Sequence, residues 1–161
     1  MLKKAVVGIF TIVVMCLGTE TMGQDYQTGV GLRLGVSNGL TVKHFISDRA
    51  ALEGILHTRW SGLVITGLYE VHQEIPEVSG LFWFYGGGAH LGTWNGNRGN
   101  PSWPDNQNGY TIFGIDGIIG LDYKFAEVPI GLSFDYKPAY NISDVSRFWG
   151  AELALSIRYV F

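Results

Sequence analysis

The chain has almost no cysteine and, beyond its first residues, no long hydrophobic run. Its single cysteine, Cys16, lies in an apolar run near the start, so the remainder contains no residue able to form a disulfide. Beyond residue 23 no stretch is continuously apolar for 18 residues, which excludes a bundle of membrane-spanning helices. There is no run of basic residues either, and this excludes nucleic acid as a partner.

The first 23 residues have the layout of a secretory signal peptide. Lys3 and Lys4 precede an apolar run over 5–17, and small or polar residues follow as far as Gly23. A membrane-spanning helix needs about 20 apolar residues, and this run is too short to be one. We therefore expect cleavage before Gln24, which leaves a single domain over 24–161.

A lipoprotein signal is the alternative for this segment. Such a signal would be cut before Cys16, which would then be acylated, but Met15 is too bulky for the small residue expected there. Without Lys3, Lys4 and Glu20, the formal charge of −3 becomes −4. A charge of this size indicates no particular class of partner.

The chain has 23 glycines, and beyond residue 23 it alternates apolar with polar residues in eight segments. Period-two alternation predicts β-strands. Asn38 and Gly39 accept the backbone angles of a tight hairpin turn, and 95–109 is crowded with Gly, Asn and Pro, which predicts a loop. The expected strands cover 26–37, 41–47, 52–61, 63–75, 81–94, 110–125, 129–137 and 151–161.

The length of these strands and the composition of their polar faces favour a membrane barrel over a soluble one. Strands that cross a bilayer need roughly 9 to 11 residues, whereas strands of globular proteins usually have about five or six. The polar faces carry balanced charges, which suits pairing inside a narrow barrel. These charged residues are Arg33, Glu53, Arg59, Glu70, Asp116, Asp122, Lys124, Asp135, Lys137, Glu152 and Arg158. The sequence therefore predicts an all-β, eight-stranded antiparallel up-and-down transmembrane barrel.

Aromatic residues gather near the expected strand ends, where their rings can lie at lipid headgroups. Short turns are expected near 48–50, 76–80 and 126–128, and the long 95–109 loop falls at the opposite end. Short inner turns and longer outer loops are typical of membrane barrels. We therefore expect both termini in the periplasm. The aromatic residues are Trp60, Trp83, Tyr85, Trp94, Tyr123, Phe125, Tyr136 and Tyr159.

The chain ends in SIRYVF, with Ile157, Tyr159 and Phe161 at alternate positions. This ending resembles the C-terminal signal that is read by the outer-membrane barrel assembly machinery. The chain as a whole resembles the small OmpA/OmpX-type barrels. The stretches FYGGGAHLGTW, GIDGIIGLDYKF and VPIGLSFDYKPAYN are similar to those of uncharacterised outer-membrane β-barrel proteins. The resemblance implies that the protein lies in the outer membrane of a Gram-negative bacterium. Its expected partners are the lipid of that membrane and the barrel assembly machinery.

The charged residues of the polar faces are expected to pair with one another in the lumen, since an unpaired buried charge costs several kcal/mol. Asp116 with Lys137, and Asp135 with Arg158, are the pairs that we expect first. The predicted structural network consists of Arg33, Glu53, Arg59, Glu70, Asp116, Asp135, Lys137 and Arg158.

Three histidines, His57, His72 and His90, share the inward face of successive strands and raise the question of a metal site. His72 is expected at a different depth from the other two, so we predict no metal and no cofactor. A general acid and a general base could come from Glu53, Glu70 and His72. The set most similar to the catalytic residues of a lipid-modifying enzyme is Ser61, His57 and Glu70. These residues form no known motif, and the prediction is that the protein is not an enzyme.

The resemblance does not settle a function, because related barrels include adhesins, structural barrels and a few lipid-modifying enzymes. We expect a structural or surface-binding role, with Trp94, Arg98 and Trp103 as possible loop contacts. Two alternatives stay open: a lipid-modifying outer-membrane enzyme, and a soluble periplasmic small-ligand binder of the lipocalin kind.

Overall fold

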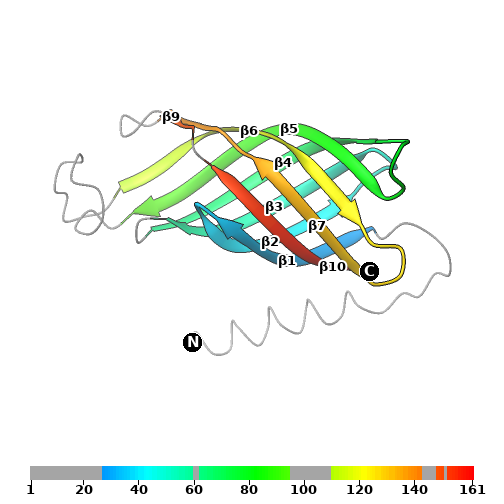
Figure 1. The fold of residues 1–161 in the computed structure, drawn as a ribbon. Helices are drawn as coiled ribbons and strands as arrows, with labels where there is room; N and C mark the ends of the chain where they lie inside the picture. The colour runs from blue at the N-terminus through cyan, green and yellow to red at the C-terminus, as the bar shows by residue number, and fades with distance from the viewer. Residues whose placement is uncertain (1–26, 60–61, 95–109, 143–147, 151) are drawn as a thin grey trace, which may run out of the picture.

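The computed structural model describes residues 27–59, 62–94, 110–142, 148–150 and 152–161. They form one antiparallel sheet that closes on itself (Figure 1). The expected signal peptide (1–23) lies outside the described residues. The strand segments are β1 (Thr28–Gly35), β2 (Asn38–Phe45), β3 (Ala50–Arg59), β4 (Gly62–Glu74), β5 (Leu81–Trp94), β6 (Tyr110–Lys124), β7 (Ile130–Tyr136), β8 (Ala139–Asn141), β9 (Phe148–Trp149) and β10 (Leu153–Val160).

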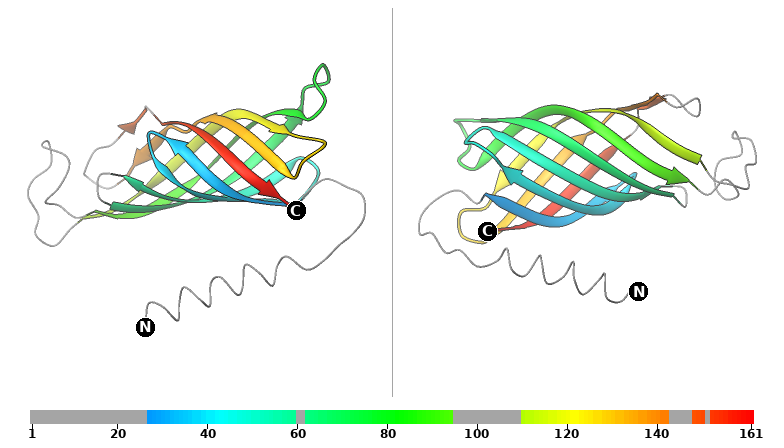
Figure 2. Two further views of the ribbon diagram at one scale, coloured as in Figure 1. Left: turned by 60° about the horizontal axis from the view of Figure 1, so that its bottom comes forward. Right: turned by 180° about the vertical axis from the view of Figure 1, so that it is seen from behind.

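The sheet is a barrel of eight strands, because β8 continues β7 and β9 leads into β10. Each strand pairs with its neighbours in the chain, and β1 pairs with β10 to close the barrel (Figure 2). Pro138 interrupts the seventh strand without shifting its register on β6, since Ile119 pairs with Tyr136 and Asp116 with Ala139. The predicted all-β antiparallel barrel of eight strands is confirmed.

A one-residue bulge separates β9 from β10. Ala139 pairs with Trp149, whereas Tyr136 pairs with Leu153, so one extra residue lies between the two pairings. Because side chains alternate along a strand, the extra residue lets Trp149 and Glu152 both face the interior.

The register gives the barrel its tilt and its narrow bore. Starting at Leu32 and stepping from each residue to its partner through β2, β3 and β4, the register leads to Leu91 on β5. Stepping the other way round the barrel, through β10, β7 and β6, it leads to Leu81 on the same strand. The offset of 91 − 81 = 10 residues is the shear of the barrel. With eight strands it requires a tilt of roughly 40°. A barrel of this size has room for side chains but not for a wide channel.

The charged face of each strand points into the barrel and the apolar face points outward, as predicted. On β7, Phe134 is 52% exposed while its neighbour Asp135 is 1% exposed. On β10, Ile157 is 45% exposed and Arg158 is 2% exposed. This arrangement is the inverse of a soluble barrel, in which apolar side chains fill the interior.

The first hairpin turn differs from the prediction. It lies at Val36 and Ser37, whereas Asn38 and Gly39 belong to β2. The side chain of Asn38 accepts a hydrogen bond from the Gly35 N–H (3.0 Å), so it stabilises the turn from the first strand position. In the predicted 76–80 turn, Gly80 has a φ of +83°, a conformation that glycine adopts most readily.

The two ends of the described chain meet at one end of the barrel. The N–H of Thr28 donates to the Phe161 carbonyl (3.1 Å), and the N–H of Phe161 donates back to Thr28 (2.9 Å). We call this the terminal end, and the opposite end, where β5 finishes and β6 begins, the loop end. No helix in the described part of the chain is long and apolar enough to cross a membrane.

Candidate functional site

Among the described residues, the lumen holds one cluster of charged side chains toward each end of the barrel, in addition to the ion pair of Arg33 and Asp135. Along β3, Ile55 separates Glu53 from His57, and along β6, Ile118 separates Asp122 from Asp116. The terminal-end cluster consists of Lys43, Glu53, Glu70, Asp122 and Arg158. The loop-end cluster consists of His90, Asp116, Lys137, Asn141 and Glu152. Between them lies an apolar cluster of Ile55, Leu68, Phe84 and Ile118.

Lys43 is the centre of the terminal-end cluster. Its Nζ lies 2.8 Å from Glu70 Oε2 and 3.4 Å from both Glu53 Oε2 and Asp122 Oδ2. The same ammonium group lies 4.2 Å from the centroid of the Phe84 ring. Since these partners come from β3, β4, β5 and β6, one side chain links walls that are distant in sequence.

Arg158 forms the second cationic link of the terminal-end cluster. Its Nη2 lies 2.6 Å from Glu53 Oε1, and its Nη1 donates to Ser133 Oγ (2.7 Å). The hydroxyl of Thr41 also donates to Glu53 Oε1. Charge-assisted hydrogen bonds of this kind are about twice as strong as neutral ones. Glu53, on β3, is thus held by side chains of β2 and β10.

The predicted pair of Asp135 with Arg158 is wrong. Both oxygens of Asp135 instead accept from Arg33, at 2.7 Å from Nη1 and 2.6 Å from Nη2. Asp135 lies opposite Ala154 in the register, four residues before Arg158, which is about 13 Å along the strand. The stagger of the strands therefore brings a different arginine to Asp135.

The loop-end cluster contains the predicted pair of Lys137 and Asp116. Lys137 Nζ lies 2.7 Å from Asp116 Oδ1 and 3.3 Å from Glu152 Oε2. The ring of His90 bridges Asp116 Oδ2 (2.6 Å from Nδ1) and Asn141 Oδ1 (2.7 Å from Nε2). His90 also stacks on Trp149, with ring centroids 5.4 Å apart. Toward the loop end the cluster is covered by apolar Val64, Ile112, Ala139 and Trp149.

His57 is buried in the lumen, but neither of its ring nitrogens has a hydrogen-bond partner. It is not close to Glu70, which lies opposite Ala51 on β3, six residues or about 20 Å away. Ser61, the third residue of the possible enzyme site, lies outside the described residues. Within the described ranges, no three His, Cys, Asp or Glu side chains gather as metal ligands do.

Glu53, Glu70 and His72 do come together. His72 Nε2 lies 3.0 Å from Glu70 Oε2, and Lys43 Nζ lies within 3.4 Å of a carboxyl oxygen of both glutamates. The ring of His72 stacks on Phe84 with centroids 4.9 Å apart. These groups are almost fully buried, so a substrate could not approach them without opening the barrel.

Lys43 is the most important lumenal residue missing from the predicted network. In the second strand, Thr41 and Lys43 alternate with Leu40 and Val42. This alternation is the signal that could have identified Lys43.

The remaining predicted site residues lie on the outer surface or outside the described part. The side chains of Ile157, Tyr159 and Phe161 point outward at the terminal end. The side chains of Arg59 and Trp94, and all of Arg98 and Trp103, lie outside the described residues, as does the 95–109 loop.

Comparison with known proteins supports the fold. The N-terminal β-barrel domain of OprF from Pseudomonas aeruginosa superimposes with a TM-score of 0.64 over 86% of this chain and 100% of that domain, at 16% sequence identity. No family profile matches the sequence. No curated protein matches it significantly. At this level of identity the chain shares the fold of that barrel domain.

Proposed function

We propose that this chain is an integral outer-membrane β-barrel protein with a lumen filled by side chains and a structural or surface-binding role. The observation that carries the proposal is the inverted distribution of residues, with ions buried inside and large apolar side chains exposed outside. Exposed apolar surface of this extent on a monomer marks contact with lipid or a partner. The similarity to the OprF barrel domain supports the same conclusion.

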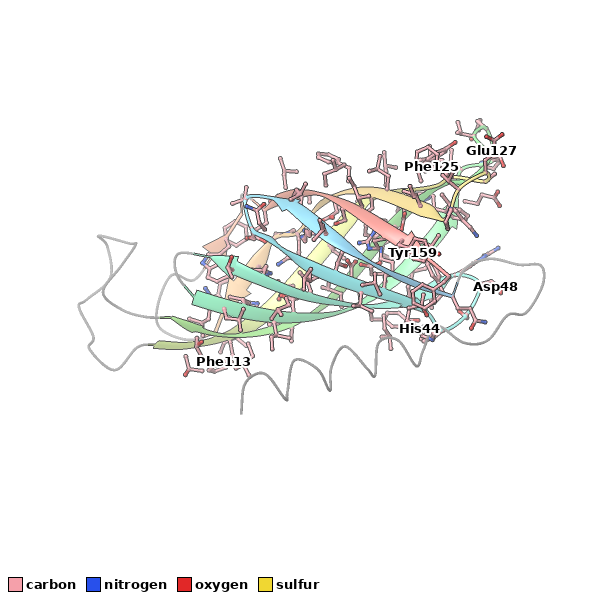
Figure 3. The ribbon with its side chains drawn as sticks, turned by 90° about the horizontal axis from the view of Figure 1, so that it is seen from below. His44, Asp48, Phe113, Phe125, Glu127 and Tyr159 are labelled. Atoms are coloured by element: carbon pink, nitrogen blue, oxygen red, sulfur yellow. The ribbon has the colours of Figure 1, made fainter. Side chains whose placement is uncertain are left out.

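The height of the apolar surface supports a bilayer as its partner. On β6, Phe113 and Tyr123 are 123 − 113 = 10 residues apart. At a tilt of roughly 40° this is about 25 Å along the barrel axis, equal to the apolar band of outer-membrane barrels. Figure 3 places Phe113 toward one end and Phe125 toward the other. Aromatic residues that would flank the band are Trp83, Tyr85, Tyr123, Phe125, Tyr159 and Phe161 at the terminal end, and Phe113, Tyr140 and Phe148 at the loop end.

The lumen argues against a soluble ligand-binding barrel. A lipocalin-type binder keeps an apolar cavity, whereas here cross-lumen ion pairs such as Arg33 with Asp135 and Arg158 with Glu53 occupy the interior. We infer that the barrel does not conduct as a steady open pore. Planar bilayer recordings should therefore show no stable single-channel conductance.

Fractionation of cells that express the full chain tests the proposal. The protein is expected in the outer membrane, resistant to extraction with carbonate, and to migrate differently on gels before and after heating in detergent. A soluble periplasmic protein serves as the control for lysis. Recovery of the chain with that control in the soluble periplasm would contradict the proposal.

We further propose that the protein is not an enzyme, that both termini face the periplasm, and that Ile157, Tyr159 and Phe161 contact the barrel assembly machinery. Lipid A from cells with and without the gene should have the same mass. An altered acyl pattern would instead favour the lipid-modifying alternative. Replacing Phe161 with Ser should slow insertion without changing the fold of the protein once it is inserted.

A further inference from the structure

At the terminal end, the outer wall carries aromatic rings on only some of its strands. There, β5, β6 and β10 each present a pair of outward aromatic residues. In the described part of β1 to β4, the two outward positions nearest that end hold no aromatic residue. They are Thr28, Val30, Val42, His44, Ala50, Leu52, Val71 and Gln73. On this wall, hydrogen-bonding side chains therefore take the place of aromatic rings.

His44 lies on the outer face of β2 at the level of the aromatic residues. It pairs in the register with Thr28, and Thr28 exchanges backbone hydrogen bonds with Phe161 on β10. The shear of ten residues over eight strands shifts the level by 10 × 2/8 = 2.5 residues across two strands, which makes His44 level with Tyr159. Figure 3 shows His44 and Tyr159 toward the same end of the barrel. His44 is therefore at the depth where the aromatic rings meet lipid headgroups.

The imidazole ring of His44 is oriented by Thr28. Thr28 Oγ1 lies 2.8 Å from His44 Nδ1. The side chain is exposed, and within the described ranges Nε2 has no hydrogen-bond partner. When the Thr28 hydroxyl donates to Nδ1, the ring proton lies on Nε2 and is directed away from Thr28. This N–H group then needs an acceptor at the edge of the apolar band, because hydrocarbon provides none.

The turn that follows β2 adds one cation and one anion. Arg49 is exposed and forms no salt bridge with the described residues, and Asp48 beside it is exposed as well. The Arg49 carbonyl accepts a hydrogen bond from the His72 N–H (2.7 Å), so the turn lies beside the terminal end of β4, where Glu74 is exposed. A guanidinium group recognises phosphate. The two carboxylates disfavour a purely anionic group and favour one that also carries an ammonium.

We propose that His44 and Arg49 bind the phosphate of a zwitterionic phospholipid headgroup, and that Asp48 pairs with the ammonium group of the same headgroup. This inference rests on the proposed function, which places lipid against the outer wall. The Nε2–H of His44 donates to a phosphate oxygen, and Thr28 is the positioning residue that sets the tautomer of the ring. All phospholipids carry the phosphate, so the ammonium is the group that the carboxylates select.

Native mass spectrometry of the purified full barrel tests the site. The protein is released from micelles that contain equal amounts of phosphatidylethanolamine and phosphatidylglycerol, and the lipids that stay bound are identified by mass. Wild type should retain more phosphatidylethanolamine. H44F should lower this retention by about tenfold, the size expected for loss of a hydrogen bond to a charged group. R49Q should lower it as well.

The anionic residue is tested by a pair of matched variants. D48N should remove the preference for phosphatidylethanolamine over phosphatidylglycerol, because the ammonium loses its partner. E127Q removes an exposed carboxylate from the turn between β6 and β7 and should behave as wild type (Figure 3). Each variant should migrate as a folded barrel on gels run without heating.

Nitrogen-15 NMR of labelled histidine provides a second readout. In vesicles of phosphatidylethanolamine and phosphatidylcholine, His44 should carry its proton on Nε2, and this proton should show a contact with lipid phosphorus. The H44F spectrum identifies the signal by its absence. T28V should populate both ring tautomers, and T28S should restore the wild-type spectrum.

Three results would overturn the proposal. They are equal lipid retention by folded wild type, H44F and R49Q; a wild-type preference for phosphatidylglycerol; and a ring proton of His44 on Nδ1. Each of them leaves the barrel in the membrane. They are therefore distinct from recovery of the chain in the soluble periplasm, which would contradict the proposed function itself.

Discussion

The inner and outer walls of this barrel are built from alternate residues of the same strands, yet they are suited to different solvents. Phe134 and Asp135 are neighbours on β7, and the first is half exposed while the second is fully buried and bound to Arg33. Because a strand changes face at every residue, no separate segment is needed for each environment. The inner wall is held by specific ion pairs, whereas the outer wall requires only apolar side chains.

The largest expected effect of a single substitution lies on the inner wall. R158M removes the arginine from Glu53 and leaves a buried carboxylate with fewer donors. The free energy of unfolding in lipid vesicles should fall by about 3–5 kcal/mol. I157M, on the adjacent outward position, is the control and should cost less than about 1.5 kcal/mol. Equal effects of the two variants would mean that water reaches the lumen.

A charge on the outer wall should have the next largest effect. F134R lies near the middle of the apolar band and should cost about 2–4 kcal/mol in vesicles. F113R, close to the loop-end aromatics, should cost roughly 0–1 kcal/mol. Urea titrations of both variants in the same lipid measure the difference. If both arginines are tolerated equally, the outer wall does not contact a bilayer core.

Two histidines of the lumen should respond in opposite directions. H57L removes two buried nitrogens that have no partner, and stability should be unchanged or rise by up to about 1–3 kcal/mol. H90L should be destabilising by a similar amount, because Asp116 and Asn141 each lose their hydrogen bond to the His90 ring. The midpoint of thermal unfolding in detergent compares them. A clear loss of stability in H57L would indicate a partner such as a bound water.

The strands and the orientation of their faces could be predicted from the sequence because period-two alternation is a local property. Asp116, Asp122 and Asp135 were all assigned to the inner wall in this way, and all three are buried. The individual ion pairs depend on the ten-residue shear, which no single strand reveals. Asp135 was therefore assigned to Arg158, although the register brings Arg33 to it.

Lys43 was missed for a different reason, which is the predicted start of its strand. The hairpin signal of Asn38 and Gly39 suggested that the second strand begins later than it does. The strand was therefore expected only from residue 41, and its inward lysine was not included in the network.

The most direct test of the inverted barrel is the accessibility of spin labels on neighbouring residues of β7. Cysteines are introduced at Phe134 and, separately, at Asp135 in a chain whose Cys16 is replaced by serine, and each variant is labelled with a nitroxide and reconstituted into vesicles. The label at position 134 should be relaxed strongly by oxygen, which concentrates in lipid, and weakly by a water-soluble nickel chelate. The label at 135 should be protected from both. Strong relaxation of the 134 label by the nickel chelate would contradict a lipid-facing outer wall.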